Sequence, residues 1–239
     1  MNTIPEFKGL LSNNTLDNFL KTPSEDSIKA VLHELLELKY EDHKEKFLSF
    51  TQNYHNYGLD ENTVHGIDLI VKYFPKDVGI FIPLILNVIV SEPGQALLIP
   101  TGTLHAYLEG DLIEAMALSD NVIRAAMTPK FVDVENLFKV MNFKPQGPQY
   151  LEGQSNQEGV FYFPTGFSSF NLESGKIAEG KKAKINKKFD ASIIAVLNGT
   201  VKLNGEEYKS GSTVLIMPQT ELEIESLSGT AEFYICSSK

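Results

Sequence analysis

The stretch Gly94-Gln-Ala-Leu-Leu-Ile-Pro100-Thr-Gly102-Thr-Leu-His105 decides how this chain is interpreted. An apolar run follows the first glycine, the proline and second glycine predict a tight turn, and one histidine stands at the start of the next expected strand. This arrangement is typical of a β-barrel whose interior holds a metal ion. Residues 211–220 repeat the glycine, apolar run, proline and turn weakly, but no histidine follows.

The composition is that of a folded, acidic protein. Hydrophobic residues make up 42% of the 239 positions, which excludes a disordered chain. The net charge of −10 argues against nucleic-acid or anionic-membrane partners, because these usually require a basic surface. Cys236 is the single cysteine, so no intramolecular disulfide is possible. No signal-peptide pattern opens the sequence and no apolar run approaches membrane-spanning length, so we expect a cytoplasmic protein.

Residues 1–75 predict a helical segment. Ser24 is the expected N-cap of one helix, because acidic residues fill the next turn and apolar residues then recur at helical spacing. A second helix is expected over residues 39–57, and a third begins at the cap Asp60 and ends before Pro75. The acidic residues between 25 and 45 fit a solvated helix face.

The periodicity changes from residue 77 onward and predicts strands. The expected strands before residue 128 are Ile80–Val90, Gln95–Ile99, Tyr107–Ala117 and Val122–Met127, with a Pro-Gly turn at residues 93–94. A short helix is expected from Asp133 to Met141. Residues 142–159 are rich in Pro, Gly, Gln and Ser and predict a crossing loop, whereas residues 160–239 predict short strands separated by turns.

A longer string of residues is more specific than the spacing around His105. It comprises His105-Ala-Tyr-Leu-Glu-Gly-Asp111, Glu114-Ala-Met-Ala, Ser119-Asp-Asn-Val-Ile-Arg124-Ala and Thr128-Pro-Lys130-Phe. Two upstream segments, Ile4-Pro-Glu-Phe7 and residues 77–87, belong to the same pattern. Together these pieces closely resemble the zinc-dependent (type I) mannose-6-phosphate isomerases of the cupin superfamily. The likeness is strong from residue 77 to about residue 143 and weak over residues 160–239.

The resemblance implies an α+β fold of cupin-like antiparallel β-barrel or jelly-roll units with an N-terminal helical segment. It divides the chain into a helical segment (1–75), the C-terminal part of a catalytic cupin domain (76–143), a linker or crossing loop (144–159) and a second cupin-like domain without metal ligands (160–239).

The same resemblance implies a site. The family interconverts mannose 6-phosphate and fructose 6-phosphate and binds one zinc ion through a glutamine, two histidines and a glutamate. The implied site residues are His105 as the last zinc ligand, Glu114 and Arg124 as catalytic residues, and Tyr107, Asp111 and Lys130 as residues lining the substrate cavity. Glu114 would move the proton between C1 and C2, and Arg124 would hold the enediolate oxygen or orient the sugar. Ala126 stands where the family commonly has glycine.

The family's Gln-x-His pair and zinc glutamate find no counterpart in this sequence. The other histidines, His33, His43, His55 and His65, fall on expected helices or their ends, and none forms such a pair. We therefore expect the C-terminal portion of such an enzyme, inactive by itself and with zinc absent or weakly bound. Exposed barrel edges would favour self-association.

Two alternative functions stay open. The first is a non-catalytic cupin-like module that binds a sugar phosphate or a protein partner. The second is another cupin enzyme, such as an iron dioxygenase, which would need a second histidine-bearing motif that the sequence lacks. For single residues the alternatives are a solvent-facing carboxylate at Glu114, a buried ion pair at Arg124 and a solvated lysine at Lys130.

Overall fold

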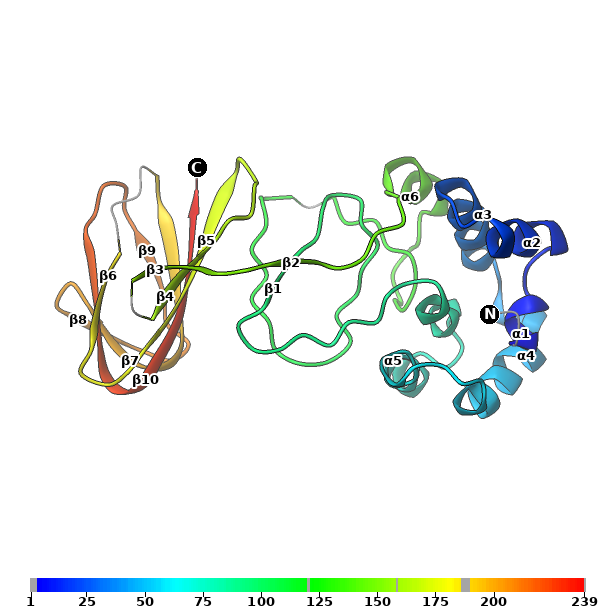
Figure 1. Cartoon of the computed structure of the whole chain (residues 1–239), viewed down its shortest axis with the longest axis horizontal. Coiled ribbons are helices and arrows are strands. Elements are labelled where there is room, and N and C mark those ends of the chain that lie inside the picture. Colours follow the sequence, from blue (N-terminus) through cyan, green and yellow to red (C-terminus); the bar gives the residue numbers. More distant parts are fainter. Residues whose placement is uncertain (1–3, 120, 158, 186–189, 239) are drawn as a thin grey trace. The chain divides into compact units, whose positions relative to one another are not determined.

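The computed structural model describes residues 4–119, 121–157, 159–185 and 190–238. The chain forms two compact units, one from Met1–Ser91, Ile99–Asp111 and Asp120–Pro148, and one from Glu92–Leu98, Leu112–Ser119 and Gln149–Lys239. The helices belong to the first unit and the strands to the second. Figure 1 labels these helices and strands. Asp120, part of the string that carries the resemblance, lies outside the described residues. No described helix is long and apolar enough to cross a membrane.

Side-chain caps begin most helices of the first unit. The elements are α1 (Pro5–Lys8), α2 (Asn13–Lys21), α3 (Glu25–Leu36), α4 (Tyr40–Asn53), the 3₁₀ turn η1 (Tyr54–Asn56), α5 (Glu61–Tyr73), the 3₁₀ helix η2 (Val78–Leu84) and α6 (Val134–Val140). Ser24 accepts a hydrogen bond from the Ser27 amide at 3.2 Å, and Ser27 returns one by accepting from the Ser24 amide at 2.8 Å. Asp60 and Asp133 cap α5 and α6. The predicted helix starts at these three caps are confirmed.

Four phenylalanine rings form the centre of the first core. Phe81 is fully buried, and its ring centroid lies 4.6 Å from that of Phe50, 5.0 Å from that of Phe47 and 6.5 Å from that of Phe7. The rings come from η2, α4 and α1. Aromatic contacts at these separations stabilise a core beyond the area that they bury. The rings therefore join three helical elements that are distant in sequence.

The predicted strand Ile80–Val90 is wrong. Its first half lies in η2, which begins where the Asp77 side chain accepts a hydrogen bond from the Gly79 amide at 2.7 Å. A short apolar run can become a buried strand or a buried helix, and periodicity does not separate the two. Here the apolar run is buried against helices, because Phe81 packs against α1 and α4.

The predicted strands Tyr107–Ala117 and Val122–Met127 are also wrong, since their described residues form no strand. The predicted strand Gln95–Ile99 is confirmed in its middle as β1 (Ala96–Leu98), which pairs antiparallel with β2 (Gln149–Leu151). β1 is only partly buried, although a buried strand was expected. A strand persists only where a neighbour satisfies its backbone amides and carbonyls. β1 has such a neighbour, and within the described part of the chain the other runs do not.

The backbone supports the internal repeat. Gly94 has a φ of 88° and precedes β1, and Gly211 has a φ of 87° and precedes β9 (Thr213–Ile216). After the proline of each copy, Gly102 and Gln219 also have positive φ values, 81° and 60°. The predicted Pro-Gly turn is confirmed, because the Gln95 amide donates to the Glu92 carbonyl at 3.1 Å.

The second unit contains an eight-stranded antiparallel sheet. Besides β9, its strands are β3 (Gln154–Gln157), β4 (Val160–Phe163), β5 (Phe170–Ile177), β6 (Lys182–Ile185), β7 (Ser192–Leu203), β8 (Glu206–Lys209) and β10 (Leu222–Ser238). The hydrogen-bonded order is β3-β4-β5-β10-β7-β8, with β6 also pairing with β10 and β9 with β7. Figure 1 shows β10, coloured red, as the longest strand of this unit. The prediction of strands and turns over residues 160–239 is confirmed.

Two long strands change partners along their length. β10 pairs with β6 over Leu222–Glu225 and with β5 over Ala231–Ser238, and β7 pairs with β9 and then with β8. Gly199 lies at the change of partner in β7, with a φ of 78°. A Cβ at this position would lie 3.1 Å from three backbone atoms of β10, so only glycine allows this close approach. The sheet thereby bends around a core that includes Ile194, Val196 and Phe233.

Residues 144–159 contain β2 and β3, whereas a crossing loop was predicted. Their Pro-, Gly- and Gln-rich composition favours a loop locally. Neighbouring strands override that preference, since β2 pairs with β1 and β3 pairs with β4. Strand formation here is a tertiary effect rather than a local one.

Candidate functional site

The structure places all six predicted site residues at exposed positions without regular secondary structure. They are His105, Tyr107, Asp111, Glu114, Arg124 and Lys130. Five of them belong to the first unit, and Glu114 belongs to the second. Within the first unit, His105 and Tyr107 lie together, with ring centroids 5.6 Å apart and an edge-on geometry.

The imidazole of His105 has a defined orientation. Its Nδ1 lies 2.8 Å from the main-chain carbonyl oxygen of Thr103. Because a carbonyl only accepts, Nδ1 carries the proton in this contact and the lone pair of the neutral ring resides on Nε2. Metal-binding histidines are commonly held this way, with one nitrogen donating to a carbonyl and the other left for the metal.

Thr103 is a site residue that the sequence analysis missed. The Pro-Thr-Gly-Thr turn places its carbonyl beside the imidazole, and the turn closes with a 3.1 Å hydrogen bond from the Thr103 amide to the Pro100 carbonyl. Gly102, with a φ of 81°, permits the turn. The positions of Pro100 and Gly102 predict the turn, and the turn could have predicted that the Thr103 carbonyl lies beside His105.

A complete metal site is not present in the part of the chain that the structure describes. Within these residues, no group of three or more histidine, cysteine, aspartate or glutamate side chains could hold a metal ion. Three of the other four histidines make side-chain contacts: Nδ1 of His33 lies 3.3 Å from Glu37, Nε2 of His55 lies 3.2 Å from Asp68, and Nε2 of His65 lies 3.1 Å from Glu109. His105 therefore fits zinc as one donor, but these residues do not form a set of donors.

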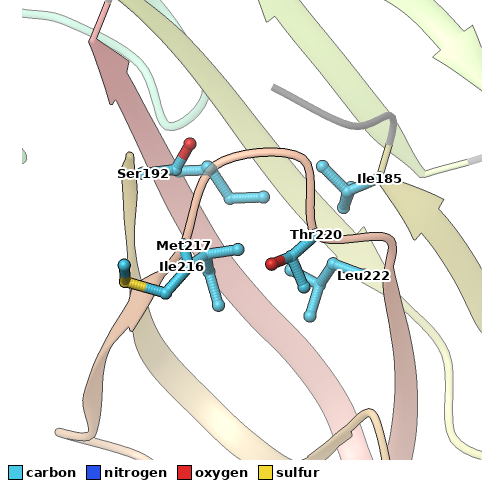
Figure 2. Close-up of a pocket in the computed structure, with 7 residues that line it drawn as sticks. Ile185, Ser192, Ile216, Met217, Thr220 and Leu222 are labelled. Carbon is cyan, nitrogen blue, oxygen red and sulfur yellow. The ribbon is translucent and has the colours of Figure 1, made fainter. Parts of the chain in front are cut away.

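Two hollows are lined by residues other than the predicted site residues. One is a cavity of about 10 Å³ in the second unit, and its lining includes Ile185, Ser192, Ile216, Thr220 and Leu222 (Figure 2). It is large enough for no more than about one water molecule. The other is an open, polar groove of about 400 Å³ between α2 and α3, lined by Asn14, Asn18, Lys21 and Asp26 among others. Neither contains a predicted site residue.

The comparisons with known proteins agree with the resemblance. Mannose-6-phosphate isomerase of Salmonella typhimurium is 34% identical over 220 residues, which cover 87% of this chain and 55% of that protein. The Escherichia coli enzyme of the same name is 31% identical over 186 residues, covering 72% of this chain and 46% of its own length. This chain is a homologue of the mannose-6-phosphate isomerases. It spans about half the length of the relatives that it matches. No protein-family model matches the chain.

The fold agrees with that of a solved mannose 6-phosphate isomerase. The apo form of the Salmonella typhimurium protein matches 100% of this chain and 61% of its own chain, with a TM-score of 0.77 and 24% sequence identity. The predicted α+β class is thereby confirmed, and the fold is that of this solved isomerase. Neither of the two sheets closes into a barrel over the described ranges.

Proposed function

We propose that this chain contributes to the sugar-phosphate site of a mannose-6-phosphate isomerase, an aldose–ketose isomerase. The observation that carries the proposal is the contiguous string from His105 to Lys130, in which the Thr103 carbonyl orients the imidazole of His105. The relatives that share this region are named mannose-6-phosphate isomerases. The substrates are therefore mannose 6-phosphate and fructose 6-phosphate.

Isomerisation of these sugars moves a proton between C1 and C2 through an enediol. This chemistry needs a group that takes up and returns the proton, and a positive charge close to the developing oxyanion. Glu114 is the proposed proton carrier. Arg124 is the proposed cation, since a guanidinium keeps its charge at any working pH and can donate to two oxygens at once. Tyr107, Asp111 and Lys130 are proposed to contact the sugar and its phosphate.

Zinc, when bound, would polarise the oxygens at C1 and C2 of the sugar. Nε2 of His105 is proposed as one ligand, because Nδ1 donates its hydrogen bond to the Thr103 carbonyl. One imidazole alone binds zinc weakly at neutral pH. We therefore keep the expectation that the chain by itself holds less than one equivalent of zinc and is inactive as an isomerase.

Binding and turnover are tested separately on the full chain. Titration with mannose 6-phosphate is followed by calorimetry, and turnover by an assay coupled to fructose 6-phosphate, with zinc content measured in parallel. We expect Arg124→Ala to weaken binding about tenfold or more, as the loss of a charged hydrogen bond predicts. Glu207→Gln, at an exposed position of β8, is the matched surface control.

The outcomes separate the hypotheses. Binding that depends on Arg124 and Lys130 supports the proposed site. Binding that is unaffected by these changes would contradict it and favour the non-catalytic module. Turnover with one equivalent of zinc would refute the expectation that the chain alone is inactive.

A further inference from the structure

The segments that carry five of the predicted site residues have no sheet to hold them. Residues 99–111 and 121–133 of the first unit contain neither strand nor helix. Without ladder hydrogen bonds, such segments keep much of their backbone freedom unless side chains attach them elsewhere. A binding site nevertheless requires its groups to be held in place.

Leu108 attaches the first segment to α5. It is half-buried, although Tyr107 and Glu109 on either side are exposed, and it packs against the first core. Leu108 lies beside Gly66 of α5: a Cβ there would be in ordinary contact with Cδ1 of Leu108, at 3.6 Å, and in closer contact with Cγ1 of Val88, at 3.1 Å. Next to this contact, Nε2 of His65 lies 3.1 Å from Oε2 of Glu109. Consecutive residues of α5 thus contact consecutive residues of the segment.

Met127 attaches the second segment to η2. It is half-buried against the first core and has a φ of 54°, which is unusual for a residue with a side chain. A Cβ at Gly79 would lie 2.5 Å from Cγ of Met127, so the methionine occupies the space that the missing side chain leaves. Asp77 holds the Gly79 amide at 2.7 Å.

Each anchor lies close to predicted site residues in sequence. Leu108 stands three residues after His105 and three before Asp111, and Met127 stands three residues after Arg124 and three before Lys130. Three residues of chain span at most about 10 Å, so an anchored residue restricts the region its neighbours can reach.

We propose that Leu108 and Met127 are positioning residues, which seat against Gly66 and Gly79 and so hold His105, Asp111, Arg124 and Lys130 on the helical part of the first unit. The inference rests on the proposed function, which assigns those four residues to the sugar-phosphate site. The anchoring itself is a property of the first unit and can be tested without substrate.

The test uses the full chain with Leu108→Ala and Met127→Ala. The matched controls are Leu215→Ala and Met217→Ala, which remove the same side chains at exposed positions, 61% and 62% exposed. Amide hydrogen exchange is followed by mass spectrometry in peptides covering 104–111, 121–130 and α4. The imidazole proton signals of His105 are followed by NMR, and mannose 6-phosphate affinity by calorimetry.

We expect Leu108→Ala to raise exchange in 104–111 roughly tenfold, as loss of a half-buried leucine predicts, with α4 unchanged. The His105 signals should shift in this variant, and Leu108→Met, which keeps the volume, should restore them. Met127→Ala should raise exchange in 121–130 and weaken mannose 6-phosphate binding.

Exchange and His105 signals in both variants that match the controls would overturn the positioning role. A general rise that includes α4 would also overturn it, because it would show a role in overall stability alone. If wild-type chain does not bind mannose 6-phosphate but local exchange responds as expected, the proposed function fails while the anchoring stands.

Discussion

The phenolic oxygen of Tyr57 lies 2.7 Å and 2.8 Å from the two carboxylate oxygens of Glu6. Glu6 belongs to α1 and is only 7% exposed, and the Ser49 hydroxyl of α4 donates to the same carboxylate. A buried carboxylate is costly unless hydrogen-bond donors surround it. These contacts therefore fix α1 against the helices that follow it.

Tyr57→Phe should lower the free energy of unfolding by about 1–3 kcal/mol, because the Glu6 carboxylate then loses a donor. Burial, and then the hydrogen bond to Glu6, raises the pKa of Tyr57 to about 12. Since the unfolded tyrosine titrates near pH 10, the stabilisation by the neutral phenol is present below about pH 10 and is lost as the pH rises towards 12. Urea unfolding at several pH values, followed by circular dichroism, measures both effects. Equal alkaline losses in wild type and variant would contradict this role.

Phe81→Ala should destabilise the first unit by about 3–5 kcal/mol, the usual cost of deleting a buried aromatic side chain. Phe131→Ala is the control, because Phe131 is 84% exposed and its removal should cost no more than about 0.5 kcal/mol. Urea unfolding followed at 222 nm reports on the helices. A small effect of Phe81→Ala would show that this ring does not organise the first core.

Gly175→Ala should destabilise the second unit by about 1–3 kcal/mol or more through overpacking. A Cβ on this residue of β5 would lie 2.0 Å from Cζ of Phe233, which is fully buried on β10. Gly147→Ala is the matched control, since a Cβ there meets nothing within 4 Å. Hydrogen exchange of β10 peptides measures the change, and normal protection in Gly175→Ala would mean that Phe233 moves aside freely.

Self-association through exposed barrel edges, and the apolar surface there, stays a prediction of the sequence. Leu112, Met116 and Leu118 lie in one run of the second unit and are 51%, 54% and 105% exposed. Apolar surface of this kind favours association. The triple substitution of these residues by aspartate should lower the concentration-dependent mass measured by light scattering. A wild-type chain that stays monomeric at all concentrations would contradict the prediction.

Local signals predicted the helical segment well. The caps Ser24, Asp60 and Asp133 each accept a hydrogen bond from the amide three positions on, so these bonds need no distant partner. Ser12 caps α2 in the same way. This helix lies within the predicted helical segment 1–75, although its own start was not predicted. Residues 160–239 were predicted at the level of short strands and turns, but not that β7 continues through Gly199 for 12 residues.

Strands of the first barrel-like region could not be predicted in the same way. The apolar runs near residues 80, 107 and 122 have strand-like composition, yet a strand also needs a partner that sequence periodicity does not identify. For the candidate site, the residues themselves came from the resemblance. The carbonyl of Thr103 and the anchors Leu108 and Met127 came from the structure, because their contacts join positions that turns or long segments separate.

The amino-acid sequence by itself determined the helix starts, the Pro-Gly turn, the α+β class and the resemblance to a zinc-dependent isomerase. The helix starts and the turn rest on neighbouring residues, whose backbone angles and hydrogen bonds are set over a few positions, and the resemblance rests on the order of residue types along the chain. The tertiary structure alone decided that Phe81 joins a helical core and that Leu108 and Met127 seat against glycines of α5 and η2. Such contacts depend on which distant segment supplies the space, and burial of apolar surface makes that choice only when the whole unit has folded.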